Sequence, residues 1–340
     1  MAFPHAMLRC GYPYERVLGM RRVTTFPVDV AVGDDRIYVI GRTELGVGGN
    51  IRMVSLKTDD ELGDDLTHGD LGTMADTGHL WPVGVLRTDD GNLHVLDEGN
   101  HNVTTYSPEG EKLNEWGEHG SGPGQLDRPS GFAFDADGNI WIVDTQNHRI
   151  QRFSSEGEYI GGFGELGDGP GQFNMPWGIT FDSEGNLYIS DWRNDRVQKL
   201  TASGEHIMDF GTRPGYEVQR PCGIAVDEDG DLYVAERNKH RVVMYDHRGR
   251  YVESFYGAAT LGRMGREYIR ANQKTLRLRE MTSLEEQKLL RFPQGVRYHE
   301  GRLYVCDFGS HRVQIFRKEA EPLTEQQIMV ELRAPTLSTT

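Results

Sequence analysis

The 340-residue chain contains little cysteine, which limits the ways in which it can be stabilised. Its three cysteines, Cys10, Cys222 and Cys306, are odd in number and widely spaced. The disulfide framework of a secreted protein uses an even set of cysteines, so this pattern predicts free thiols and a reducing compartment. We therefore expect a cytoplasmic protein.

Long apolar runs are missing as well. No segment approaches the roughly 18 apolar residues that a membrane-spanning helix requires. Residues 1–22 also lack the apolar core of a secretory signal. The sequence therefore predicts no association with a membrane.

Positive charge is in deficit. The chain has 37 Lys and Arg against 52 Asp and Glu, which gives a formal net charge of −15. Such a charge repels the phosphates of nucleic acids and of anionic lipids, so we expect neither as a partner.

The sequence contains one pattern that is repeated six times and is clearest from Met175 to Leu200. A Pro-x-Gly turn opens a short apolar run, an acidic turn follows, a second run ends at an aspartate, and a loop leads into a third run. Short β-branched and aromatic runs between turn residues are typical of strands. The copies begin at Pro27, Pro82, Pro129, Pro176, Pro221 and Pro293.

A strand-built repeat of about 45 residues is the signature of a propeller blade. One blade cannot bury both of its faces alone, so the copies must stack around an axis. The sequence therefore predicts an all-β, six-bladed β-propeller over residues 1–317, with a C-terminal tail over residues 318–340.

The two ends of the repeat region predict how the ring closes. Residues 1–14 are expected to form an irregular lead, but Glu15 to Gly19 resembles the fourth run of later copies, such as Glu158 to Gly164. The last copy has no clear fourth run after Phe316. We expect the N-terminal strand to complete the last blade, because closure removes the open edge of the ring.

An insertion separates the fifth and sixth copies. Residues 258–291 change to helix formers and to Arg and Lys, and Ser283 begins a capping-box pattern. The sequence predicts a helical insertion that is either a lid over one face or a contact for a second copy or another protein.

The loop after each second strand resembles a known family. It is DTQNHRI from Asp144 to Ile150, and related sequences begin at Asp97, Asp191, Glu236 and Asp307. This resembles the NHL repeat, and six copies over residues 15–317 resemble the six-bladed NHL propellers. The resemblance implies the fold and names no function.

The motif side chains are expected to serve the blades. The aspartates can accept hydrogen bonds from turn amides, and the arginines five residues later can pair with them. The motif histidines recur in register, which favours a structural role over metal binding: His101, His148, His240 and His311.

Strand direction places the Pro-x-Gly turns and the aspartate loops on one face and the acidic turns on the other. The residues after the repeat prolines should ring the mouth of the axis: Val28, Val83, Ser130, Trp177, Cys222 and Gln294. A second ring should follow the loop aspartates: Arg42, Glu98, Thr145, Trp192, Arg237 and Phe308, with Arg193 beside Trp192.

The residues at these ring positions differ between the copies, whereas the motif around them repeats, as expected of a binding face. Trp, Phe and Arg favour a small anionic, partly apolar ligand. The predicted substrate-binding residues are Arg42, Trp177, Trp192, Arg193, Arg237, Gln294 and Phe308. The alternative is that the Trp side chains only fill the axis.

Several residues are candidates for chemistry on that ligand. General acid or base work could fall to Glu98, His79, Tyr268 or Asp29. Cys222 is either a thiol nucleophile or a buried inert side chain. Nothing in the spacing selects among them.

The resemblance to amidating lyases of propeller type implies a His directly after several repeat prolines, where zinc binds, and this chain has none there. Calcium-dependent lactonases of related type need several carboxylates around the axis, and only Asp29 and Glu98 qualify here. We predict no metal and no cofactor.

Two functions follow. The first is a metal-independent enzyme of lyase or hydrolase type that acts on a small anionic substrate at the axis mouth. The second is a non-catalytic NHL scaffold for protein interactions. An enclosed pocket at the mouth under residues 258–291 favours the first, and a flat exposed face favours the second.

Overall fold

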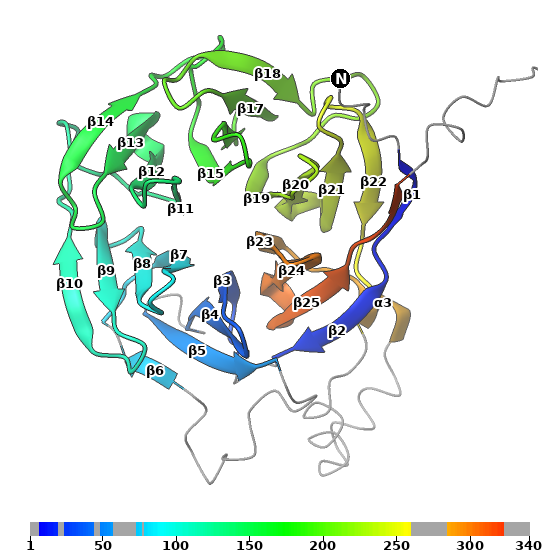
Figure 1. Ribbon diagram of the computed structural model, residues 1–340, viewed down its shortest axis with the longest axis horizontal. Coiled ribbons are helices and arrows are strands. Elements are labelled where there is room, and N and C mark those ends of the chain that lie inside the picture. Colours follow the sequence, from blue (N-terminus) through cyan, green and yellow to red (C-terminus); the bar gives the residue numbers. More distant parts are fainter. Residues whose placement is uncertain are drawn as a thin grey trace, which may run out of the picture.

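The computed structural model describes residues 7–19, 24–43, 48–56, 73–76, 78–259 and 284–322. Six four-stranded antiparallel sheets surround a central axis (Figure 1). The first strands of neighbouring blades contact one another in a closed ring, so they are the innermost strands. The predicted all-β, six-bladed propeller is confirmed.

Each of the first three blades runs outward from the axis. Blade 1 contains β3 (Pro27–Val32), β4 (Arg36–Arg42), β5 (Gly49–Ser55) and β6 (Thr73–Asp76). Blade 2 contains β7 (Pro82–Arg87), β8 (Leu93–Asp97), β9 (Asn102–Tyr106) and β10 (Lys112–Trp116). Blade 3 contains β11 (Gly131–Phe134), β12 (Ile140–Asp144), β13 (Arg149–Phe153) and β14 (Tyr159–Phe163).

The next two blades repeat this order. Blade 4 contains β15 (Pro176–Phe181), β16 (Leu187–Asp191), β17 (Arg196–Leu200) and β18 (His206–Phe210). Blade 5 contains β19 (Pro221–Val226), β20 (Leu232–Glu236), β21 (Arg241–Tyr245) and β22 (Tyr251–Phe255). Short 3-10 turns follow three of the second strands: η1 (Thr145–Asn147), η2 (Arg237–Lys239) and η3 (Phe308–Ser310).

Blade 6 is completed by the N-terminal part of the chain, as predicted. β23 (Pro293–His299), β24 (Arg302–Asp307) and β25 (Arg312–Arg317) are joined at the outer edge by β2 (Tyr14–Leu18). Figure 1 shows β2 in blue beside β25 in orange. The ring is thereby closed with strands from both ends of the repeat region.

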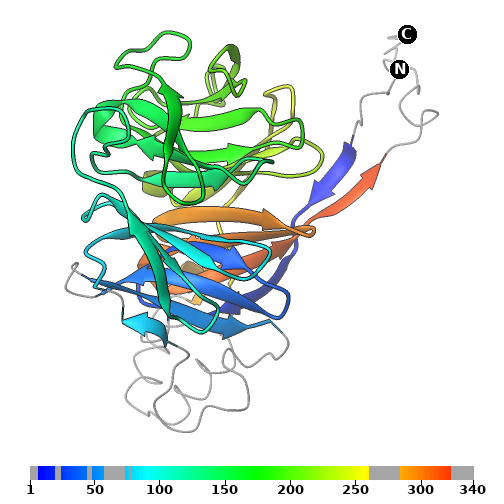
Figure 2. The ribbon, with the colours of Figure 1, turned by 60° about the vertical axis from the view of Figure 1, so that its left-hand side comes forward.

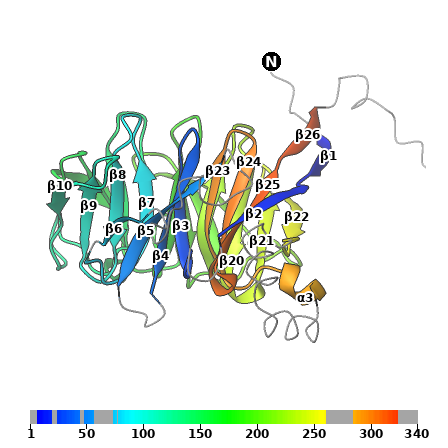
Figure 3. The same ribbon diagram turned by 90° about the horizontal axis from the view of Figure 1, so that it is seen from below.

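Residues 7–11 form a strand and not the irregular lead that the sequence predicted. β1 (Met7–Gly11) pairs antiparallel with β26 (Glu319–Pro322). This two-stranded ribbon leaves the body of the propeller (Figure 2). Of the predicted insertion, the structure describes residues 258–259 and 284–291, which include α3 (Leu284–Lys288). In Figure 3, α3 lies on the side of the ring opposite to the ribbon of β1 and β26. None of the described helices has the length and apolar character needed to cross a bilayer.

A buried ammonium group pins the base of the ribbon to blade 5. The Lys318 Nζ donates to carboxylates of Asp227 at 2.6 Å and Asp229 at 2.8 Å, and lies 3.3 Å from Asp231. Burial raises the pKa of Asp231 to about 6, with the charge of Asp227 adding to the effect. Blades 3 and 4 pair the first aspartate of this turn with a cation of their own third strand, but blade 5 has Met244 there.

The motif aspartates hold the loops as expected. Asp144 is fully buried and accepts the backbone N–H of Asp127 at 2.7 Å and the Nε of Arg149 at 2.8 Å. Arg149 then donates from its other nitrogens to loop carbonyls. A buried carboxylate satisfied in this way fixes the start of one blade to the second strand of the same blade.

The motif histidines join neighbouring blades. His148 has a left-handed backbone (φ 55°), and its Nδ1 accepts the N–H of Met175 at 3.0 Å. Met175 precedes the next repeat proline and is itself left-handed (φ 52°). The same bond joins His101 to Arg128, His240 to Phe292 and His311 to Phe26, and Asp195 takes the place of the histidine toward Arg220. The predicted structural role is confirmed.

Glycine lets the first strands approach closely around the axis. A Cβ at Gly131, Gly178, Gly223 or Gly295 would overlap a backbone carbonyl of the next blade. Blade 1 has Asp29 at this position, and its carboxylate accepts from Arg297 Nε at 3.0 Å. Asp29 and Arg297 therefore form an ion pair on the axis, with the carboxylate buried and the guanidinium partly buried.

We expect His148→Ala to lower the free energy of unfolding by about 1 kcal/mol at pH 7.5, because one interblade hydrogen bond is lost. Burial, and then the charge of Arg193, lowers the pKa of His148. The neutral, accepting imidazole is therefore complete above about pH 6.5 and is lost as the pH falls toward the lowered value. Urea unfolding should show a smaller cost of this substitution at pH 5.5 than at pH 7.5.

The matched control is His148→Asp, since blade 4 uses Asp195 for the same bond. It should retain most of the stability at pH 7.5 and lose less of it at pH 5.5. An equal cost of His148→Ala at both pH values would contradict the role assigned to the neutral imidazole.

We expect Asp29→Gly to cost about 1–3 kcal/mol in urea unfolding, although it restores the glycine of the other blades, because it leaves the partly buried Arg297 guanidinium without its carboxylate. The double variant Asp29→Gly/Arg297→Ala should recover much of that loss. Additive costs in this double-mutant cycle would show that the two side chains are not coupled.

Candidate functional site

A pocket of about 460 Å³ opens at the mouth of the axis. We call it the mouth pocket, and its lining comes from blades 1, 2, 3, 4 and 6: Phe26, Arg42, Thr43, Trp81, Glu98, Arg128, Trp177 and Phe308. All of these residues precede a first strand, lie at its start, or lie at or just after the end of a second strand, which puts them on the face of the aspartate loops. The volume is within the range of small-molecule sites.

Two arginines clamp the one carboxylate in this lining. The side chain of Glu98 is only 10% exposed, and its Oε1 accepts from Arg128 Nε at 2.9 Å and from Arg128 Nη2 at 2.5 Å. Its Oε2 accepts from Arg42 Nη2 at 3.2 Å. The carboxylate of Glu98 in blade 2 is therefore held between guanidinium groups of blades 1 and 3.

A third guanidinium group adds positive charge at the rim. Arg237 lies 5.2 Å from the ring centre of Phe308, and its Nε is buried without a hydrogen-bond partner among the described residues. Burial lowers the pKa of Arg42, Glu98 opposes this effect, and the nearby charge of Arg237 lowers it further. Since arginine stays charged in proteins, three cations face one carboxylate here.

Aromatic side chains form the walls. Phe26 and Phe308 have ring centres 5.0 Å apart. Arg128 lies over Trp81 at 5.1 Å, and Trp177 contacts Trp192 with ring centres 6.2 Å apart. The pocket thus presents π faces together with uncompensated guanidinium groups, which suits an anion with an apolar part.

The axis is narrow next to the mouth pocket. A cavity of about 40 Å³ lies along the axis and shares Trp177 with the mouth pocket. Its lining includes Val28, Gln294 and the ion pair of Asp29 with Arg297. The ion pair therefore lies on the axis beside the mouth pocket.

The structure gathers part of the predicted site. Arg42, Glu98, Trp177 and Phe308 line the mouth pocket. Arg237 and Trp192 contact its lining, and the guanidinium of Arg193 lies 5.7 Å from the ring centre of Trp192. Gln294 lines the axis cavity instead. Tyr268 lies outside the described residues.

The sequence prediction missed Phe26, Trp81 and Arg128. Each of them directly precedes a repeat proline, one position before the predicted ring. Phe26 and Arg128 adopt left-handed backbones (φ 43° and 50°), which the proline rule does not anticipate, because it favours extended geometry before proline. One signal in the sequence could have identified them: the residue directly before the repeat proline differs between the copies, as the residues of the predicted ring do.

His79 is not at the mouth, contrary to the prediction of a catalytic role there. It is 3% exposed within blade 2. Its Nδ1 lies 3.1 Å from Asp97 Oδ2, and its Nε2 lies 3.3 Å from the hydroxyl of Tyr106. His79 thus helps to hold the motif aspartate of its blade.

Cys222 corresponds to the buried alternative. Its side chain is in the core, and its Sγ donates to the carbonyl of Ala235 at 3.2 Å. Burial raises the pKa of Cys222 to about 11, so the thiolate needed for nucleophilic attack is scarce at neutral pH. Burial also raises the pKa of Cys306.

We expect native protein in a Cys10→Ser background to react with fewer than 0.1 equivalents of Ellman's reagent within minutes at pH 7.5. The same sample in guanidinium chloride should release two equivalents from Cys222 and Cys306. Rapid labelling of one thiol in the folded protein would restore Cys222 as a candidate nucleophile.

Two clusters of the described residues have the donors for a metal ion. In the first, His101 Nδ1 already accepts the N–H of Arg128, so its Nε2 carries a proton and cannot ligate beside His119 and Asp127. In the second, Lys318 occupies the centre of the three aspartates. Neither cluster is at the mouth pocket, and the absence of a catalytic metal stays a prediction.

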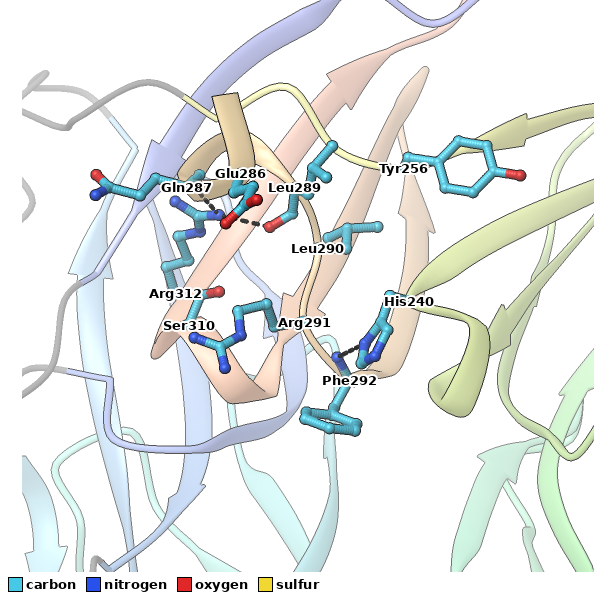
Figure 4. Close-up of a pocket in the computed structure, with 10 residues that line it drawn as sticks. All are labelled: His240, Tyr256, Glu286, Gln287, Leu289, Leu290, Arg291, Phe292, Ser310 and Arg312. Atoms are coloured by element: carbon cyan, nitrogen blue, oxygen red, sulfur yellow. Dashed lines mark hydrogen bonds between the residues drawn. The ribbon is translucent and has the colours of Figure 1, made fainter. Parts of the chain in front are cut away.

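A second hollow, the side groove, lies between blades 5 and 6 beside α3, with a volume of about 810 Å³. Figure 4 shows Arg312 against the turn of Gln287 and Leu289, and His240 above Phe292. Arg312 is also bound to Asp307, so its guanidinium is engaged within the fold. The described parts of the predicted lid border this groove and are absent from the lining of the mouth pocket.

Comparison with known proteins agrees with the repeat. The family model of the NHL repeat matches residues 126–153, 173–200, 219–245 and 290–316. No curated protein sequence matches the chain.

Three solved structures illustrate the likeness in fold. A catalytically inactive variant of virginiamycin B lyase from Staphylococcus aureus, solved with quinupristin, is 15% identical, with a TM-score of 0.53 over 94% of this chain and 90% of that chain. A streptogramin B lyase is 12% identical (TM-score 0.52, 93% and 99%). An auxiliary nutrient binding protein from Bacteroides thetaiotaomicron is 12% identical (TM-score 0.59, 91% and 73%). These identities show the fold alone.

Proposed function

Because this chain is a six-bladed β-propeller that carries NHL repeats, we propose that its mouth pocket binds a small anionic, partly apolar molecule and acts on it as an enzyme of lyase type. The observation that carries the proposal is the surplus of guanidinium groups against aromatic walls. Arg237 has no carboxylate partner among the described residues, and it stands over Phe308 at the rim.

Binding of the substrate anion frees one oxygen of the Glu98 carboxylate to act as a base. The substrate anion competes with Glu98 for Arg42, which is the only side chain bound to Glu98 Oε2 among the described residues. Arg128 keeps its hold on Oε1 and so fixes the direction of the freed oxygen. Glu98 then becomes a positioned base in the mouth pocket.

A base and a cation are sufficient for an elimination. Glu98 takes a proton from the carbon next to a carbonyl, and the electron pair forms a double bond as the leaving group departs from the adjacent carbon. Arg42 and Arg237 stabilise the negative charge that develops on the carbonyl oxygen. Hydrolysis is the second reaction type, with Glu98 taking a proton from water, but the pocket offers no accessible thiol for a covalent route.

The similar structures support this class by analogy of fold alone. Two of them are lyases by name. The auxiliary nutrient binding protein shares the fold as well, so fold does not decide between catalysis and binding.

A non-catalytic scaffold is the second candidate, because the side groove exposes apolar side chains. Tyr256 is 51% exposed, Leu289 42% and Phe292 38%. A protein partner or a second copy that binds through residues 258–291 would cover them.

The test compares acids with uncharged isosteres. Benzoate and phenylacetate should quench the fluorescence of Trp81 and Trp177 and bind at least 10-fold more tightly than benzamide and phenylacetamide in calorimetry. Arg237→Ala should remove this preference. Arg250→Ala is the matched control, since Arg250 pairs with Asp246 in the exposed turn between β21 and β22 and should bind as wild type.

Glu98→Gln separates binding from chemistry. It should retain anion binding but abolish elimination in a screen of 3-acyloxy and 3-hydroxy acids. Equal affinity for acids and amides would overturn the proposed site. Failure of every acid to bind, together with self-association that is lost in Phe292→Ser, would favour the scaffold.

A further inference from the structure

The inference in this subsection rests on the proposed function. We infer that the ligand carries a second anionic group, which binds outside the mouth pocket at an outer subsite made by Trp192, Arg193 and Arg220. The ligand class is then an elongated molecule with an apolar, planar middle and an oxyanion at each end.

Two guanidinium groups lie over one indole ring in blade 4. The distance from the guanidinium carbon to the ring centre of Trp192 is 4.7 Å for Arg220 and 5.7 Å for Arg193. Guanidinium groups over a π face stay partly desolvated and keep their hydrogen-bond donors for a ligand.

The charges at this subsite are not balanced by the fold. Asp195 accepts the backbone N–H of Arg220 at 2.7 Å, in place of the motif histidine. Its carboxylate is 3.9 Å from Arg220 Nε, which is too long for a hydrogen bond. Among the described residues, no carboxylate lies within ion-pair distance of Arg193. The guanidinium groups of Arg193 and Arg220 therefore share one carboxylate, that of Asp195, which already accepts a backbone N–H.

The outer subsite is a departure from the repeat. The two residues after the motif carboxylate are Trp192 and Arg193 in blade 4, but Glu98 and Gly99 in blade 2 and Thr145 and Gln146 in blade 3. An aromatic residue followed by arginine thus occurs at one radial position. Structural needs of the blade do not require it, because the other copies fold without it.

The subsite is continuous with the mouth pocket. The ring centres of Trp192 and Trp177 are 6.2 Å apart with planes tilted by 46°. Trp177 lines the mouth pocket together with Arg42, and Arg237 lies near enough to Arg42 for its charge to act on it. A ligand that fills the pocket with one anionic end therefore extends its planar middle across Trp177 and brings its other end to Arg193 and Arg220.

The experiment uses rigid aromatic acids of increasing length. Terephthalate, naphthalene-2,6-dicarboxylate and biphenyl-4,4′-dicarboxylate are each compared in calorimetry with the corresponding monocarboxylate. A biphenyl with one carboxylate and one phosphonate tests whether the outer oxyanion is a carboxylate or a phosphate, and the biphenyl acid with a 4′-carboxamide is the uncharged control.

At one length, the diacid should bind at least 10-fold more tightly than its monoacid, and the carboxamide should lose this gain. Arg193→Gln/Arg220→Gln should abolish the gain while leaving monoacid binding unchanged, and Trp192→Ala should reduce it. Arg237→Ala should weaken monoacids and diacids alike. Arg213→Gln is the matched control in an exposed loop of the same blade and should change neither.

The outcomes separate the two hypotheses. If monoacids bind in an Arg237-dependent way but no diacid gains affinity, or if the gain survives Arg193→Gln/Arg220→Gln, the outer subsite is wrong and the proposed function stands. If no acid of either kind binds, both are wrong.

Discussion

The interblade hydrogen bond from a backbone N–H to the motif histidine determines more than the packing of the blades. It holds two left-handed residues from neighbouring blades in place, one at the histidine and one before the next repeat proline. Such a conformation costs of the order of 1–2 kcal/mol for a residue with a side chain, so it persists only where it is bonded. At Phe26 and Arg128 the same geometry puts the side chains into the lining of the mouth pocket. The motif histidines His311 and His101, which join neighbouring blades, thus also position two side chains of the mouth pocket.

The fold was predictable because each repeat carries its own turn residues, and the fourth-strand likeness of Glu15 to Gly19 led directly to the closure by β2. The ribbon of β1 and β26 was not, because its short strands pair only with each other and have no repeat to compare with. Within the first ring, side-chain size decided the outcome. The small side chain of Cys222 is buried between first strands, whereas Trp177 is too large for that space and stands at the mouth.

Net charge was a poor guide to the face that matters. The carboxylates gather in the acidic turns, where Asp135 and Asp182 pair with cations of their own blades. The opposite face carries the arginines Arg42, Arg128, Arg193, Arg220 and Arg237. A formal charge of −15 averages over both faces. An anion that approaches the mouth meets the local field, since charges beyond about 10 Å are largely screened at physiological salt.

The positions where the repeat is broken share one physical consequence. Asp29 replaces an axial glycine and pairs with Arg297 on the axis below the mouth pocket. Glu98 follows its motif aspartate and is clamped by two arginines. Both departures put a carboxylate against guanidinium groups in a part of the fold with little exposed surface, where charge interactions are stronger than in open water. In the proposed reaction, a substrate anion displaces Glu98 from Arg42 at small net cost, because one carboxylate replaces another. The proposal that Glu98 acts as a base therefore depends on the clamp that holds its other oxygen in place.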